Sequence, residues 1–78
     1  SVTLYQISFT YRADAAVLRT RISELRAAAR AAQDREEAER LKRRIAELQV
    51  LRRQSSELAE LTKRYYERND HRDERYTL

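Results

Sequence analysis

Side chains that could transfer protons or hold a metal gather in one short stretch near the C-terminus. There the single histidine of the chain, His71, stands beside Asp70, and Asp73 and Glu74 follow closely. Imidazole and carboxylate groups can serve in acid–base chemistry. However, the stretch is polar throughout, the chain has no cysteine, and no nucleophile with a positioned base accompanies the histidine. We therefore expect no enzyme activity, no metal site and no cofactor, and we interpret the stretch as a solvated tail.

Basic residues are the second group that could do chemistry. The chain carries 17 Lys and Arg against 13 Asp and Glu, which gives a formal net charge of +4. Basic clusters attract phosphates, and six positions are candidate nucleic-acid contacts: Arg40, Lys42, Arg43, Arg44, Arg52 and Arg53. Glutamates alternate with them, so ion pairs between residues three or four apart on a solvated helix are the favoured explanation. Nucleic-acid binding is therefore the alternative function rather than the favoured one.

A separate set of arginines recurs every seven residues at Arg12, Arg19 and Arg26. This spacing is typical of the edge positions of a coiled coil, which predicts salt bridges to a neighbouring helix. Use of the three arginines as a ladder for phosphates is the second interpretation.

Composition indicates which elements position these residues. The chain has 78 residues and neither glycine nor proline, the residues that build hairpin turns and phosphate-binding loops. Helix is the natural consequence, and a chain this short without disulfides or a metal needs association for stability. No apolar run reaches the ~20 residues of a membrane span, so we expect a cytoplasmic protein with no membrane partner.

One narrow apolar stripe runs along the first part of the chain. It consists of Leu4, Ile7, Tyr11, Leu18, Ile22 and Leu25, and continues weakly through Ala29 and Ala32. This periodicity predicts a helix over about residues 3–32. Residues 2–11 also alternate as a strand would, but a lone strand has no sheet to complete, so we favour helix there.

A second apolar stripe predicts another helix over about residues 35–66. It consists of Ala38, Leu41, Ile45, Leu48, Leu51, Leu58, Thr62 and Tyr65. A turn at about residues 32–34 would let the two stripes face each other, with Asp34 capping the second helix. Residues 67–78 are expected to form a polar tail.

The fold class that follows is all-α, with residues 1–78 as a single domain built as an antiparallel two-helix, coiled-coil-like hairpin. The expected pairs are Ile7 with Leu61, Tyr11 with Leu58, Leu18 with Leu51, and Leu25 with Leu41 or Ile45. One continuous helix in a coiled-coil dimer is the alternative, since no glycine enforces the turn.

Aromatic residues near the N-terminus indicate a partner. In a helix, Tyr5 and Phe9 lie on the face opposite Leu4 and Ile7, so one hairpin cannot bury both sets. We expect dimerisation into a four-helix bundle, with this oligomer interface: Leu18, Ile22, Leu25, Leu41, Ile45, Leu48, Leu51, Leu58, Tyr5, Phe9 and Tyr65. The predicted function is a small non-enzymatic interaction module that acts through self-association, as a homodimer, or through a helical protein partner.

The stretches 4–12 and 65–72 are similar to those of short uncharacterised bacterial proteins that form helical hairpins, some of them carried on mobile genetic elements. This resemblance implies a bacterial, cytoplasmic protein in a DNA-related context, and it assigns no functional residue.

Overall fold

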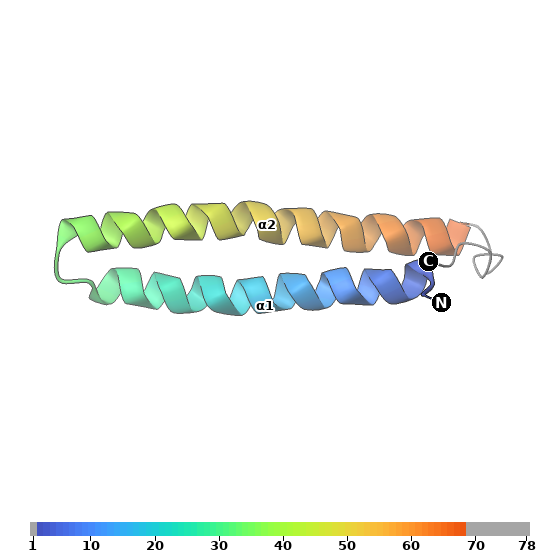
Figure 1. Ribbon diagram of the computed structural model, residues 1–78, viewed down its shortest axis with the longest axis horizontal. Helices are drawn as coiled ribbons and strands as arrows, with labels where there is room; N and C mark the ends of the chain where they lie inside the picture. Colours follow the sequence, from blue (N-terminus) through green and yellow to red (C-terminus); the bar gives the residue numbers. More distant parts are fainter. Residues whose placement is uncertain (1, 69–78) are drawn as a thin grey trace.

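The computed structural model describes residues 2–68, which form two long antiparallel α-helices joined by a short turn (Figure 1). Helix α1 spans Leu4–Ala31 and helix α2 spans Arg35–Arg68. The helices lie side by side along their whole length, so the N-terminus of α1 lies beside the C-terminal end of α2. The all-α hairpin is therefore confirmed, and the alternative of one continuous helix is wrong.

A capping box starts α1 at Thr3. The backbone N–H of Gln6 donates to Thr3 Oγ1 over 3.1 Å, and the backbone N–H of Thr3 donates to Gln6 Oε1 over 2.9 Å. These two bonds satisfy amides that the first turn of a helix leaves without partners. The helix that follows includes residues 4–11, so the strand alternative for this segment is wrong.

The turn between the helices forms without glycine. Ala32 follows α1 with φ −59° and ψ 137°, an extended conformation that any residue adopts. The side chain of Asp34 then accepts a hydrogen bond from the backbone N–H of Glu37 over 2.7 Å, which makes Asp34 the predicted cap of α2. Glu36 and Glu37 lie in the first turn, where the helix dipole favours negative charge.

The aliphatic core lies in the half of the hairpin near the turn. Ile22, Leu25, Leu41 and Leu48 are buried, and four further residues pack against them: Leu18, Ala29, Ala32 and Ile45. Leu25, Leu41 and Ile45 thus belong to one cluster, as their predicted pairing requires.

Toward the open end of the hairpin, the fully buried side chains are small, whereas the larger Leu4, Tyr11 and Tyr66 are half-buried. Ser8, Ala15 and Ala59 are at most 3 % exposed. The Ser8 hydroxyl donates to the backbone oxygen of Tyr5 over 2.6 Å, which satisfies its buried polar group. Small residues at these positions let two helix backbones approach closely.

In this open half, the burial expected for the leucines of the predicted pairs is wrong. Leu51, Leu58 and Leu61 are 47 %, 39 % and 44 % exposed instead of being buried against α1. The seven-residue pattern that starts at Leu41, Ile45 and Leu48 continues with other side chains, which are buried or half-buried: Arg52, Ser55, Ala59, Thr62 and Tyr66. The sequence analysis assigned the leucines to the interior because they are apolar. In the structure, the interior residues are those that continue the heptad spacing from the core.

The boundaries of the helices differ little from the expected ones. Helix α2 continues through Arg68, two residues past its expected end, and the rest of the predicted polar tail lies outside the described residues. Neither helix, as described over residues 4–68, is apolar enough to cross a membrane.

Candidate interaction surfaces

One flank of α2 carries large apolar side chains in the open half of the hairpin. We call these residues the α2 leucine stripe: Leu51, Leu58, Leu61 and Tyr65. Leu51, Leu58 and Tyr65 follow one another at seven-residue intervals, and Gln54 and Leu61 occupy the intervening positions, so the stripe repeats the heptad of a coiled coil. A shallow hollow lined by Gln54, Glu57, Leu58 and Leu61 lies within it.

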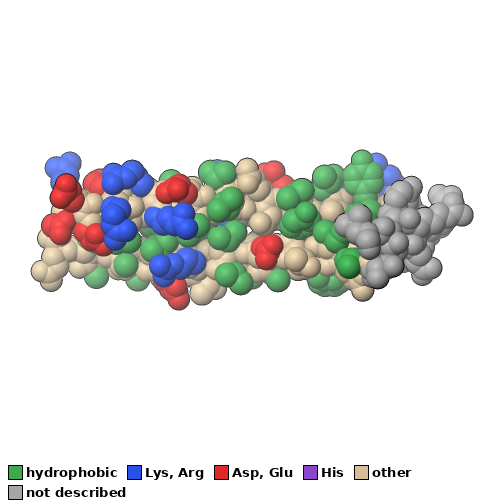
Figure 2. Space-filling view, in the orientation of Figure 1, with side chains coloured by type: hydrophobic (Ala, Val, Ile, Leu, Met, Phe, Trp, Pro, Cys, Tyr) green, Lys and Arg blue, Asp and Glu red, His purple; other side chains and the backbone are tan. Residues whose placement is uncertain are grey.

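Helix geometry explains why these leucines are exposed. At about 100° per residue, Leu58 lies roughly 80° around the helix axis from Leu48, which points into the core. The leucine stripe therefore follows the edge of the contact between the helices instead of its centre. Figure 2 shows one face of the molecule on which charged side chains gather toward the turn and hydrophobic ones toward the other end. Among the described residues, the large apolar side chains that are exposed all belong to residues 2–17 and 49–68, the half of the hairpin away from the turn.

The residues predicted as an oligomer interface divide into two groups. The first is already used within the hairpin, where Ile22, Leu25, Leu41 and Leu48 are buried and Leu18 and Ile45 pack against them. The second remains exposed and comprises Leu51, Leu58, Tyr65, Tyr5 and Phe9. Only this second group offers surface to another chain.

Tyr5 and Phe9 lie away from the leucine stripe, in an aromatic cluster at the open end. The Tyr5 ring meets the Phe9 ring edge to face, with centroids 4.9 Å apart, and stacks on Tyr66 of α2 with centroids 5.0 Å apart. The Arg12 guanidinium lies 5.8 Å from the centre of the Phe9 ring, within cation–π range. The sequence analysis did not predict the contact between Phe9 and Arg12, which their three-residue spacing on one helix face permits.

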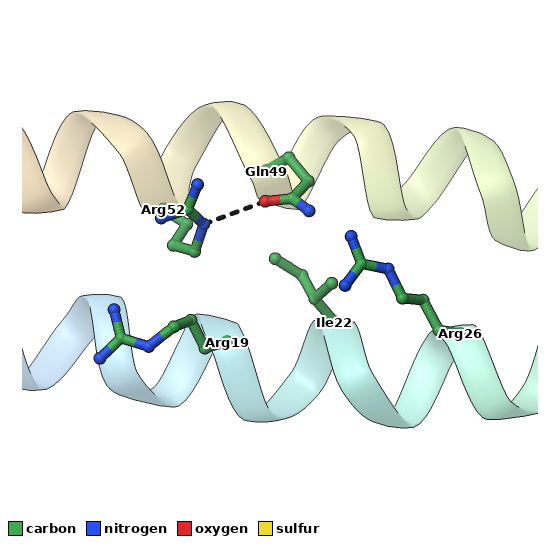
Figure 3. Close-up of a pocket in the computed structure, with 5 residues that line it drawn as sticks. All are labelled: Arg19, Ile22, Arg26, Gln49 and Arg52. Carbon is green, nitrogen blue, oxygen red and sulfur yellow. Dashed lines mark hydrogen bonds between the residues drawn. The ribbon is translucent and has the colours of Figure 1, made fainter.

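A hollow rich in arginine lies between the helices (Figure 3). Arg19 and Arg26 of α1 and Arg52 of α2 surround Ile22, and the Arg52 Nε donates to Gln49 Oε1 over 3.0 Å. These five residues line the hollow, and none of them is acidic. Figure 3 shows the face of the hairpin opposite to that in Figure 2. Helix α2 lies above α1 in both figures, but the turn end of the hairpin is at the left in Figure 2 and toward the right in Figure 3.

Within residues 2–68, the arginines predicted to form interhelical salt bridges do not do so. A second hollow, lined by Arg12, Ala15, Arg19, Ser56, Ala59 and Glu60, continues the first toward the open end. Within residues 2–68 the ion pairs are Arg21–Glu24 at 3.1 Å, Arg40–Glu37 at 2.6 Å and Arg44–Glu47 at 3.8 Å. Each joins residues of one helix, and none involves Arg12, Arg19 or Arg26.

The predicted nucleic-acid cluster near the start of α2 is partly neutralised. Arg40 donates from Nε and Nη2 to the two carboxylate oxygens of Glu37, over 3.1 Å and 2.6 Å. This hydrogen-bonded contact lowers the pKa of Glu37 and raises that of Arg40. Arg44 pairs with Glu47, whereas Lys42, Arg43 and Arg53 are exposed. Arg52 belongs instead to the hollow of Figure 3, so the structure does not bring the six residues together.

No three acidic, histidine or cysteine side chains of residues 2–68 lie close enough together to hold a metal ion. The stretch around His71 lies outside the described residues.

Comparison with known proteins adds no family, because no family model, curated protein or solved structure matches this chain. The resemblance to short bacterial helical proteins stays a prediction.

Proposed function

We propose that this protein is a non-enzymatic interaction module that binds a second copy of itself through the α2 leucine stripe. The observation that carries this proposal is the exposure of Leu51, Leu58, Leu61 and Tyr65, which lie between 39 % and 47 % exposed on one flank of one helix. Large apolar side chains gathered on a surface typically mark a binding site for another protein.

The spacing of the stripe favours a helix as its partner. Apolar residues at heptad positions pack into the matching positions of a neighbouring helix, and a second copy of this chain supplies such a helix. A two-fold arrangement would place identical stripes against each other, which is the commonest symmetry of small oligomers.

Charge complementarity supports an antiparallel arrangement of the two copies. Glu57 and Arg64 are exposed, seven residues apart, and each directly precedes a member of the stripe. If two α2 helices cross near Leu61, Leu58 of each copy lies near Tyr65 of the other, and Glu57 near Arg64. Opposite charges at such edge positions help to set the partner and its orientation.

The experiment is to measure solution mass by light scattering over a range of protein concentrations at low and high salt, with circular dichroism on the same samples. We expect a helical dimer whose mass is insensitive to salt, because apolar burial dominates the contact. Leu58→Asp should yield a monomer of unchanged helicity, since position 58 lies outside the core and the charge prevents burial of the stripe.

Ala46→Asp is the matched control. It places the same charge at an exposed apolar position of α2, about 120° around the helix from Leu58. The control should remain a dimer. A wild-type chain that is helical and monomeric at every concentration would overturn self-association, as would equal loss of the dimer in both variants.

A further inference from the structure

One flank of α1 combines aromatic and cationic side chains in a single row. Tyr5 and Phe9 begin it, and Arg12, Arg19 and Arg26 continue it at seven-residue intervals. With a rise of about 1.5 Å per residue, the arginines follow one another at roughly 10.5 Å and span roughly 21 Å. We call these five residues the α1 row.

The α1 row is joined by a fourth arginine from the other helix. Arg52 of α2 lines the same hollow as Arg19 and Arg26, and its bond to Gln49 uses only the Nε atom, so its terminal nitrogens can still donate (Figure 3). Glu60 is the one carboxylate among the lining residues of the two hollows. The ion pairs among residues 2–68 do not join it to Arg12 or Arg19. Four guanidinium groups thus stand along a groove with one acidic neighbour.

Such a concentration of positive charge suits a chain of phosphates. Guanidinium groups donate paired hydrogen bonds to phosphate oxygens, and the attraction grows when the charges are not already neutralised. Arg40 and Arg44, near the start of α2, are already paired with glutamates, so their attraction for phosphates is weaker.

The aromatic end of the α1 row narrows the chemical class of the ligand. The Phe9 ring is 49 % exposed, and contacts with Tyr5 and Arg12 fix its position next to the first arginine. Nucleobases stack on exposed aromatic rings when they are not paired within a duplex, and single-strand-binding proteins combine such rings with a cationic groove.

We infer that the α1 row, together with Arg52, binds single-stranded nucleic acid, with phosphates on the four arginines and a base on Phe9. This site lies on the flank of the hairpin opposite the leucine stripe, so it does not depend on the proposed self-association. A flexible strand follows a straight row of cations along α1, whereas a duplex turns its phosphates away from it.

The test uses fluorescence anisotropy with a labelled oligothymidylate and a labelled oligouridylate of about 20 nucleotides, and with a DNA duplex of equal length. We expect both single strands to bind more tightly than the duplex. With four phosphate contacts and a slope of about −0.7 for each, affinity for the single strands should fall about 50-fold between 50 and 200 mM salt.

Matched triple variants locate the site. Arg12→Gln/Arg19→Gln/Arg26→Gln should reduce the salt slope from about −2.8 to about −0.7, because one contact remains. The control Arg40→Gln/Arg43→Gln/Arg44→Gln removes the same net charge elsewhere and should leave the slope unchanged. Circular dichroism checks that both variants remain helical, as expected for exposed positions.

Phe9→Leu tests the stacking step separately. It keeps an apolar side chain but removes the ring, and we expect affinity for single strands to fall at least about fivefold with an unchanged salt slope. Three results would overturn the inference: no binding of either single strand by the wild-type chain at 50 mM salt, tighter binding of the duplex, or equal losses in the two triple variants. A triple variant of the row that alters solution mass but not binding would also overturn it, since the row would then pair with a second copy.

Discussion

The half of the hairpin near the turn, residues 18–48, and the open half, residues 2–17 and 49–68, fill their interiors differently. Near the turn, Ile22, Leu25 and Leu48 are buried between the helices. In the open half the fully buried residues are Ser8, Ala15 and Ala59. The larger Leu4, Tyr11 and Tyr66 are only half-buried there, and other large apolar side chains such as Leu58 are exposed. Both halves have the same backbone geometry and the same heptad spacing.

This difference separates the buried aliphatic core from the exposed large apolar side chains along one molecule. Burial of an aliphatic side chain stabilises the folded state by about 1.5–3 kcal/mol, so the turn half supplies most of the apolar contribution to folding. The open half leaves its leucines and aromatic rings available to other molecules, and small interior residues hold the two helices together there. Substitutions in the two halves should therefore have different consequences.

The largest contrast is expected between two leucines of α2. Leu48→Ala should lower the free energy of unfolding by about 2–5 kcal/mol, because it opens a cavity in the core. Leu58→Ala should lower it by less than about 1 kcal/mol at low protein concentration, because its side chain is 39 % exposed. Urea unfolding followed by circular dichroism measures both. Similar losses for the two variants at low concentration would contradict the division between the halves.

A smaller effect is expected from filling the tight interior of the open half. Ala59→Leu should cost about 1–3 kcal/mol, because position 59 is only 3 % exposed and a larger side chain forces the helices apart. Ala46→Leu, at an exposed position of the same helix, should leave stability nearly unchanged. If Ala59→Leu proves as stable as its control in urea unfolding, the open half is not closely packed.

The smallest effects should come from the two helix caps. Asp34→Ala removes the bond to the Glu37 amide and should cost about 1 kcal/mol, because the turn half depends on the start of α2. Thr3→Ala should cost less than about 0.5 kcal/mol, since a helix end at the open terminus can fray without global unfolding. Thermal unfolding compares them, with Asp34→Asn as the variant that keeps an acceptor. A larger loss for Thr3→Ala would show that the open end limits stability.

Local sequence signals predicted much of this fold. The absence of glycine and proline, the two apolar stripes and Asp34 were sufficient to predict two helices, their turn and the cap of α2. The aliphatic core near the turn was also predicted, because there the largest apolar residues coincide with the heptad positions that face α1.

The interior of the open half could not be predicted in the same way. Leu51, Leu58 and Leu61 were predicted to lie in the interior, because large apolar residues were expected to be buried. Ser8 and Ala15 gave no apolar signal, although they are the best-buried residues of the open half. The roles of Arg19, Arg26 and Arg52 depended on which flank of each helix meets the other, and their spacing alone did not reveal that they share one hollow.

The sequence by itself predicted helix over both parts of the chain and the residues near which each helix begins, because capping, helix propensity and periodicity are local properties. The tertiary structure decided between a hairpin and one continuous helix. Only the tertiary structure decided which side chains lie between the helices and which face outward. Two paired helices keep a constant geometry along their contact, so the residues at successive heptad positions become interior whatever their size. In the open half this rule buries serine and alanine, leaves Leu4, Tyr11 and Tyr66 half-buried, and leaves Leu51, Leu58 and Phe9 at the surface.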